Sequence, residues 1–242
     1  MKIVGWNKTT LLDYPEHIAT TLFTSGCNFR CPFCHNPSLV LGEVSNVVTP
    51  SENGINIISK DEIFSHLKKR IGIIDGVCIT GGEPTLQSDL MDFIGEIKAL
   101  KYKVKLDTNG YRPEILEQLL SQKLLDYVAM DIKASKEQYA AACGMDSKFQ
   151  LENIEKSVEL LKRSAVAYEF RTTFVKGIHS LGEVAEIAKW LKGCQAYYLQ
   201  QFREGELLAK NNNFEEFSLT EMEEMQEICK KYIPNTFLRG AE

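Results

Sequence analysis

Three cysteines in one short segment constrain this chain more than any other feature. Cys27, Cys31 and Cys34 have the spacing C-x3-C-x2-C and follow an apolar run, Ile18 to Phe23, that is typical of a β-strand. Three thiolates on one loop can hold three irons of a [4Fe–4S] cluster and leave the fourth iron open to a small molecule. A zinc site usually draws on a second cysteine pair and a ferredoxin on a fourth cysteine, and this segment has neither. The spacing favours such a cluster over three incidental or zinc-binding cysteines.

Length and composition narrow the remaining classes of protein. The chain has 242 residues and an ordinary apolar content, enough for one large domain with a sizeable core. Its formal net charge is −5 without a basic run, which argues against a nucleic-acid partner. It has no apolar stretch that could span a bilayer and no signal-peptide core. Its cysteine count is odd, which fits a reduced compartment better than a secreted disulfide scaffold. Cys78 is most simply a small core residue, and we assign no chemical role to Cys143, Cys194 and Cys229. We therefore expect a cytoplasmic protein without a membrane or nucleic-acid partner.

Short β-rich runs alternate with helical patterns along the chain. We expect six strands, at His17–Thr24, Gly76–Thr80, Lys103–Asp107, Tyr127–Asp131, Tyr168–Val175 and Ala196–Phe202. Six amphipathic stripes predict helices around residues 63–71, 90–100, 116–120, 151–161, 181–191 and 219–229. Parallel strands need long crossovers of this kind. The order therefore predicts a parallel α/β barrel or open sheet, too short for a closed eight-unit barrel.

We expect a single domain over residues 1–242, because no linker rich in Pro, Gly or Ser divides the chain. A lead-in of residues 1–16 precedes a barrel core of residues 17–202, and residues 203–242 form a loop and a C-terminal helix. Two segments interrupt the alternation: a polar insert at Leu39–Ser59 and a loop at Glu204–Ser218.

Glycines follow the second predicted strand, where parallel α/β folds form their active sites. The strand runs into Gly81, Gly82 and Glu83, followed by a proline. Paired glycines let a backbone approach a ligand closely, so this turn is a candidate binding segment.

Charged residues end the next two strands, and one lies inside the strand after them. Asp107 and Asn109 belong to an Asp-Thr-Asn-Gly run, and Asp131 and Lys133 follow one strand later. Two carboxylates at neighbouring strand ends repel unless a cation lies between them. Arg171, inside the fifth strand, needs either an anionic partner or a guanidinium that reaches solvent. A plainer interpretation of each motif is an Asx turn at Asn-Gly and a surface ion pair between aspartate and lysine.

Together these motifs resemble the radical S-adenosylmethionine (radical SAM) superfamily. Within it, the Asp-Thr-Asn-Gly and Asp-x-Lys runs and Cys34-His35-Asn36 are similar to activating enzymes of glycyl-radical enzymes, typified by the pyruvate formate-lyase activator. The resemblance implies a parallel partial (β/α)6 barrel, a [4Fe–4S] cluster on Cys27, Cys31 and Cys34, and bound S-adenosylmethionine. The cofactor-binding residues that it implies are Phe33, Gly81, Gly82, Glu83, Asp107, Asn109, Asp131, Lys133 and Arg171. It also implies a monovalent cation near Asp107 and Asp131.

The lead-in suggests a partner. Its Lys8-Thr9-Thr10-Leu11-Leu12-Asp13-Tyr14-Pro15 run resembles activators of the anaerobic ribonucleoside-triphosphate reductase. The resemblance implies that a flavodoxin or ferredoxin reduces the cluster, and that a 5'-deoxyadenosyl radical then removes a hydrogen from a glycine of the partner. The lead-in would flank the barrel mouth and recognise that partner. The alternative is that it caps the barrel bottom or pairs as an edge strand.

Other functions stay open at this point. Gln201 and Phe202 stand where pyruvate formate-lyase activators tend to place a histidine, although activation of that enzyme is one alternative. A radical SAM enzyme acting on a small molecule, of the 7-carboxy-7-deazaguanine synthase type, is a second, and its expected Cys-Asp-Thr is absent. A non-catalytic iron–sulfur carrier is a third, and it leaves Gly81–Glu83 and Lys133 unexplained.

Overall fold

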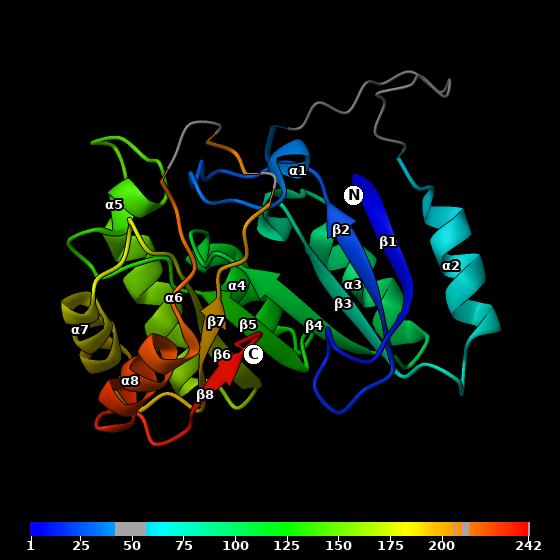
Figure 1. The fold of residues 1–242 in the computed structure, drawn as a ribbon. Helices are drawn as coiled ribbons and strands as arrows, with labels where there is room; N and C mark the ends of the chain where they lie inside the picture. The colour runs from blue at the N-terminus through cyan, green and yellow to red at the C-terminus, as the bar shows by residue number, and fades with distance from the viewer. Residues whose placement is uncertain (42–56, 206, 210–212, 242) are drawn as a thin grey trace. The chain divides into compact units, whose positions relative to one another are not determined.

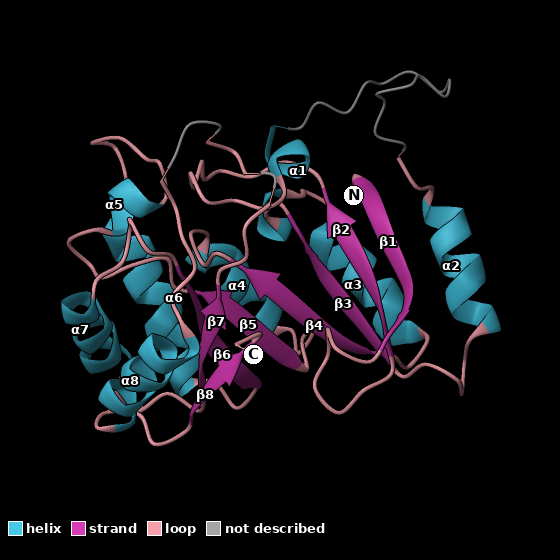
Figure 2. Cartoon of the chain, viewed as in Figure 1, coloured by secondary structure: helices cyan, strands magenta, loops and turns pink. Residues whose placement is uncertain are grey.

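The structure, a computed structural model, describes residues 1–41, 57–205, 207–209 and 213–241. Within them, eight strands form one sheet in the order β1 to β8, with helices in the connections (Figures 1 and 2). The strands are β1 (Ile3–Thr10), β2 (Ala19–Thr24), β3 (Gly76–Gly81), β4 (Lys103–Thr108), β5 (Tyr127–Asp131), β6 (Ala167–Phe174), β7 (Tyr197–Gln201) and β8 (Thr236–Arg239). The helices are α1 (Pro37–Leu41), α2 (Lys60–Lys69), the 3-10 helix η1 (Pro84–Leu86), α3 (Leu90–Ala99), α4 (Pro113–Ser121), α5 (Tyr139–Ala142), α6 (Leu151–Arg163), α7 (Leu181–Leu191) and α8 (Leu219–Lys230).

The predicted α/β class, with an open and mostly parallel sheet, is confirmed. The six expected strands are β2 to β7, each within two residues of the predicted bounds, and the six stripes lie on α2, α3, α4, α6, α7 and α8. Ile71, which the first stripe included, lies beyond α2 and is exposed. The sequence analysis missed β8, and it gave an edge strand in the lead-in, which is β1, only as an alternative. No hydrogen bonds join β1 to β8 in the described sheet, so it is not a closed barrel.

The chain clusters into two compact units that interleave in sequence. The N-terminal unit comprises Met1–Asn28, Ser38–Thr108 and Glu114–Val128; the C-terminal unit comprises Phe29–Pro37, Asn109–Pro113 and Ala129–Glu242. The single domain expected from the sequence stays a prediction. Most of the Leu39–Ser59 insert, and part of the Glu204–Ser218 loop, lie outside the described residues.

In the N-terminal unit, the lead-in forms an edge strand. β1 pairs antiparallel with β2, so that Ile3 faces Thr24 and Thr10 faces Ala19. The chain then turns, and Tyr14 packs on Gly76, where an added Cβ would lie 2.7 Å from the tyrosine ring. Because the cysteine loop follows Thr24, the far end of β2, the Leu11–Tyr14 part of the lead-in lies at the opposite end of the strand. Edge pairing is therefore what the structure shows for β1, and Leu11 and Leu12 of the following turn are 71% and 91% exposed.

In the C-terminal unit, an ion pair connects the last strand, β8, to β6. Glu169 of β6 is fully buried, and both its oxygens accept hydrogen bonds from Arg239 of β8, at 2.7 and 3.0 Å. The Arg239 guanidinium also stacks 3.8 Å from the ring centre of Tyr198 on β7. α8 packs on β7, β8 and α7, and a capping box of Ser218 and Glu221 begins it. A buried carboxylate on β6 is tolerable because this arginine faces it.

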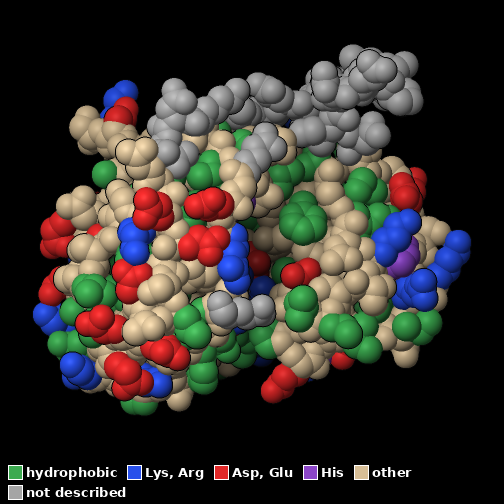
Figure 3. Space-filling model, in the orientation of Figure 1, with side chains coloured by type: hydrophobic (Ala, Val, Ile, Leu, Met, Phe, Trp, Pro, Cys, Tyr) green, Lys and Arg blue, Asp and Glu red, His purple; other side chains and the backbone are tan. Residues whose placement is uncertain are grey.

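The surface carries both signs of charge. On the face shown in Figure 3, acidic and basic side chains are interspersed over the described part of the chain. None of the described helices combines the length and the apolar character that crossing a bilayer requires.

Replacing Arg239 tests the buried ion pair. We expect Arg239→Met to lower the free energy of unfolding by about 3 kcal/mol, since it removes the guanidinium from a fully buried carboxylate. Arg163→Met is the matched control, because Arg163 is 82% exposed and 3.8 Å from Glu159, and it should cost under about 0.5 kcal/mol. Urea denaturation measures both, and equal losses would contradict the interpretation.

Candidate functional site

The start of the cysteine loop is fixed by backbone hydrogen bonds within the N-terminal unit. Ser25 N donates to the Lys2 carbonyl at 3.0 Å, and Gly26 N donates to the Leu39 carbonyl at 2.7 Å. Gln87 donates its side-chain amide to the Ser25 carbonyl at 2.9 Å. These bonds determine where the chain leaves β2 and so where Cys27 stands.

Gly81 and Gly82 bring the end of β3 against this same segment. Gly82 N donates to the Thr24 carbonyl at 2.9 Å, and Glu83 N to the Gly26 carbonyl at 2.8 Å. Gly81 has a φ of +118°, and a Cβ there would lie 2.3 Å from Thr24 N. A Cβ on Gly82 would lie 2.0 Å from the Gly26 carbonyl oxygen. Both positions therefore require glycine for the close approach of two strand ends, whatever ligand the turn also receives.

Glu83 is buried and already holds protein groups. Its Oε1 accepts hydrogen bonds from Thr85 N at 3.1 Å, the Thr85 hydroxyl at 2.6 Å and the Thr108 hydroxyl at 2.7 Å. Glu83 thereby caps η1 and links the end of β3 to the end of β4.

The rest of the cysteine loop is held inside the C-terminal unit. Cys34 N donates to the Cys31 carbonyl at 3.0 Å, which makes a tight turn around Phe33. The segment after β7 flanks this turn: Leu208 N donates to the Cys34 carbonyl at 3.1 Å, and His35 Nε2 donates to the Arg203 carbonyl at 2.6 Å. The His35 ring also packs 5.1 Å from that of Phe202. His35 therefore orients the loop.

Cys143 lies beside the cysteine loop, which the sequence analysis missed. Its carbonyl, at the end of α5, accepts a hydrogen bond from Arg30 N at 2.8 Å, and a Cβ on Gly144 would lie 2.2 Å from the Arg30 carbonyl oxygen. A hydrogen bond from the Cys143 side chain lowers the pKa of Cys31 below its ordinary value, against the opposing effect of burial. Burial raises the pKa of Cys34. No spacing rule marks Cys143, since it is more than a hundred residues from the loop.

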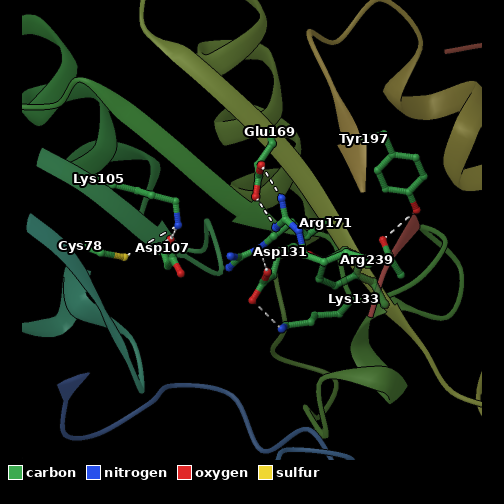
Figure 4. A network of polar contacts seen from close by, with 11 residues as sticks. Cys78, Lys105, Asp107, Asp131, Lys133, Glu169, Arg171, Tyr197 and Arg239 are labelled. Atoms are coloured by element: carbon green, nitrogen blue, oxygen red, sulfur yellow. Dashed lines mark hydrogen bonds and ion pairs between the residues drawn. The ribbon is translucent and has the colours of Figure 1, made fainter. Parts of the chain in front are cut away.

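Asp131 is paired with two cations (Figure 4). Lys133 Nζ lies 3.0 Å from one carboxylate oxygen, and Arg171 Nε lies 2.8 Å from the other. Burial favours the neutral acid, but Arg171 and Lys133 outweigh it and hold the pKa of Asp131 well below its usual range. Burial likewise disfavours the charged amine of Lys133, and Asp131 more than compensates, so that the pKa of Lys133 is raised. The ion pair expected from the sequence is present, and Asp131 is the anionic partner that Arg171 needed.

His179 is a second residue that the sequence analysis missed. Its Nδ1 accepts a hydrogen bond from Val175 N at 2.9 Å, so Nε2 carries the proton that it donates to the Lys133 carbonyl at 2.8 Å. Burial lowers the pKa of His179, in keeping with this neutral ring. Its ring also meets Phe33 edge-to-face at 6.1 Å. The histidine thus contacts both Phe33 and the backbone of Lys133.

Asp107 has a cation of its own. The Lys105 amine contacts its carboxylate directly, and the same amine lies 3.8 Å from Cys78 Sγ on β3 (Figure 4). Lys105 is 3% exposed and Asp107 14%. The sequence analysis gave Lys105 no role, because a lysine inside a strand normally points to solvent.

Asn109 forms the Asx turn that was the plainer expectation. Its Oδ1 accepts a hydrogen bond from Tyr111 N at 3.0 Å. Gly110 follows with a φ of +74°, and a Cβ there would lie 2.1 Å from the terminal carbon of Met130. Ser157 donates to the Gly110 carbonyl at 2.6 Å.

The donor chemistry of the loop fits an iron–sulfur cluster. All seven cysteines are free thiols, so no disulfide competes for Cys27, Cys31 or Cys34. The described residues contain no group of three or more His, Cys, Asp or Glu already gathered at metal-binding distances. Cys27 belongs to the N-terminal unit, whereas Cys31 and Cys34 belong to the C-terminal unit. What fits is the donor set, three free thiols on one loop, since cysteine sulfur is the usual ligand of iron in such clusters.

Comparison with known proteins identifies the family. The radical SAM superfamily matches residues 21–191. A protein of Methanocaldococcus jannaschii, provisionally named a glycyl-radical enzyme activating enzyme, is 34% identical over 94% of this chain and 91% of its own length. A protein of Thermococcus kodakarensis, provisionally named a GTP 3',8-cyclase, is 30% identical over 69% of this chain and 50% of its own length. The chain belongs to the radical SAM superfamily and is an enzyme of that iron–sulfur, S-adenosylmethionine-using class.

A solved structure supports the fold. SuiB of Streptococcus suis, crystallised with S-adenosylmethionine, superposes with a TM-score of 0.66 and 15% identity over 91% of this chain. This chain spans about half of that protein, 52% of its length. At this identity the likeness shows a shared fold.

Proposed function

We propose that Cys27, Cys31 and Cys34 ligate a [4Fe–4S] cluster and that the strand-end residues bind S-adenosylmethionine. When bound, the cluster supplies one electron for reductive cleavage of the sulfonium. The observation that carries the proposal is the match of the superfamily to residues 21–191, which include all three cysteines and the glycine turn. The fixed start of the loop at Ser25 and Gly26 supports it.

The cofactor-binding set that we propose is the one expected from the sequence: Phe33, Gly81, Gly82, Glu83, Asp107, Asn109, Asp131, Lys133 and Arg171. In the C-terminal unit, Lys133 is the residue best suited to a carboxylate, because its side chain is 19% exposed while His179 holds its backbone. Phe33, which contacts the same histidine, is the proposed neighbour of the adenine. Gly81, Gly82 and Glu83 position the cysteine loop, and the same turn is the proposed contact for the methionine part of the ligand.

We propose further that the enzyme activates a glycyl-radical enzyme, by removing a hydrogen atom from a glycine of that partner. The support is the M. jannaschii relative, whose name states that activity and whose length this chain matches almost throughout. The anaerobic ribonucleoside-triphosphate reductase is the partner that we favour, on the Lys8–Pro15 run. A reduced flavodoxin or ferredoxin is the proposed electron donor, and the cytoplasm the proposed compartment.

Action on a small molecule is the second candidate. The GTP 3',8-cyclase relative favours it, since it is 30% identical to this chain. That match covers only half of the relative, whereas the activating-enzyme match covers 91% of its length. We therefore place activation first.

Cysteine variants test the cluster ligands. After anaerobic reconstitution the protein should hold about four irons per chain. We expect Cys27→Ala, Cys31→Ala and Cys34→Ala each to lose the visible absorption of the cluster and the cleavage of S-adenosylmethionine. Cys194→Ala is the matched control and should keep both, because the Cys194 thiol lies outside the cysteine loop and donates to the Ala196 carbonyl, at 3.8 Å. Cofactor cleavage by the triple variant would refute the assignment.

Lys133→Ala tests the carboxylate partner. Loss of a charge-assisted hydrogen bond should weaken S-adenosylmethionine binding by roughly 1–3 kcal/mol, while iron content stays at the wild-type value. Lys136→Ala serves as the control, since Lys136 is 42% exposed and pairs with Glu155. Calorimetric titration compares the two variants. If they bind equally well, Lys133 is a surface residue only.

The partner is tested by electron paramagnetic resonance. Reduced protein, S-adenosylmethionine and the anaerobic ribonucleotide reductase of the same organism should give a glycyl-radical doublet and 5'-deoxyadenosine. A doublet only with a different glycyl-radical enzyme would keep the activity and remove the named partner. Turnover of GTP or another small molecule, with no doublet from any such enzyme, would favour the second candidate.

A further inference from the structure

Lys105 is a buried cation in the middle of a strand. β4 places it on the same face as Asp107, two residues on, and beside Cys78 of β3, with which it is in register. Its neighbours Val104 and Leu106 are fully buried. Taking an ammonium out of water is costly unless an anion compensates, so an apolar side chain would suit this position better if packing were its only purpose.

The anion that compensates is Asp107. The Lys105 amine contacts its Oδ1 directly. Asp107 is also one of the two aspartates to which the family resemblance assigns a monovalent cation. The other, Asp131, carries Lys133 at 3.0 Å and Arg171 at 2.8 Å within its own unit.

The charges therefore do not fit a metal cation. Asp107 already contacts an ammonium, and Asp131 already contacts an ammonium and a guanidinium. A K⁺ or Na⁺ ion added at either aspartate would meet an ammonium or guanidinium already bound to it, and like charges at such distances repel strongly in a partly buried site.

We propose that the Lys105 ammonium takes the place of a monovalent cation beside Asp107, so that this enzyme needs neither K⁺ nor Na⁺. The link to cofactor binding rests on the proposed function. The ion pair itself does not, because it exists within the N-terminal unit without any ligand.

The test compares thermal unfolding of cluster-free protein in KCl, NaCl and choline chloride at equal ionic strength. The wild-type midpoint should be the same in all three salts. Lys105→Ala removes the ammonium and leaves room beside Asp107. In choline its midpoint should fall by roughly 5–10 °C, since the half-buried Asp107 carboxylate loses the ammonium that it contacts, and K⁺ or Na⁺ should recover part of that loss.

Matched variants separate charge from space. Lys105→Met removes the same charge but fills the space, so K⁺ should not rescue it. The double variant Lys105→Ala with Asp107→Asn lacks both charges; it should fold, with one midpoint in all three salts, even if neither single variant does. A wild-type midpoint several degrees higher in KCl or NaCl than in choline would overturn the proposal. So would a Lys105→Ala protein with the same midpoint in all three salts.

Loaded enzyme gives the second readout. Wild-type S-adenosylmethionine cleavage should proceed at the same rate in KCl and in choline chloride. A rate that rises several-fold with K⁺ would count against Lys105 as the internal cation. No cleavage in any salt would count against the proposed function and leave the unfolding comparison intact.

Discussion

The close approach of two backbone segments is the constraint on which the N-terminal unit depends. Gly81 and Gly82 lie so near Thr24 and Gly26 that a single methyl group at either glycine would overlap main-chain atoms. Only this contact allows Gly82 and Glu83 to donate to the carbonyls that precede Cys27. Glu83, fixed in turn, ties β3 to β4 through Thr108. A glycine pair that looks like a ligand-binding turn is thus also what sets the position of the first cysteine.

Charge balance governs the acidic residues of the strands that follow β3. Asp107, Asp131 and Glu169 each face a lysine or arginine of their own unit, whereas buried Glu83 accepts hydrogen bonds from Thr85 and Thr108. Lys133 and Arg171 both contact Asp131. Ion pairs of this kind add little net stability, because desolvation offsets attraction, but they fix side-chain positions closely.

Hydrophobic periodicity predicted the fold well, because the alternation or stripe of apolar residues that a buried element needs is present within that element's own sequence. The six central strands and their helices carry clear alternation or stripes, so their bounds were predicted to within two residues for the strands. β8 was missed, and β1 was expected only as an alternative role of the lead-in, because the residues of both strands mix polar and apolar side chains. β8 is only Thr-Phe-Leu-Arg, and its pairing depends on an arginine that meets Glu169 70 residues away.

The site was predicted in its motifs and missed in its long-range contacts. Cys27, Cys31, Cys34 and the glycine turn are recognisable because their spacing is local. Cys143, His179 and Lys105 are not, since each acts on a residue that only the folded chain brings near: Cys31, Lys133 and Asp107. Lys105 shows this limit most clearly. A lysine in a strand normally points to solvent, but Lys105 is buried, and its ammonium changes the interpretation of Asp107 as a cation ligand.

The bond between Glu169 and Arg239 also sets an order of events during synthesis. The two residues are 70 positions apart, so at roughly 5–20 residues per second the ribosome releases the carboxylate several seconds before its guanidinium. Until Arg239 has been synthesised, burial of the Glu169 carboxylate costs more free energy than leaving it in water. We therefore expect β6 to stay outside the core during that interval. The C-terminal unit would then close late and in one step, when Arg239 emerges, rather than strand by strand as the chain is made.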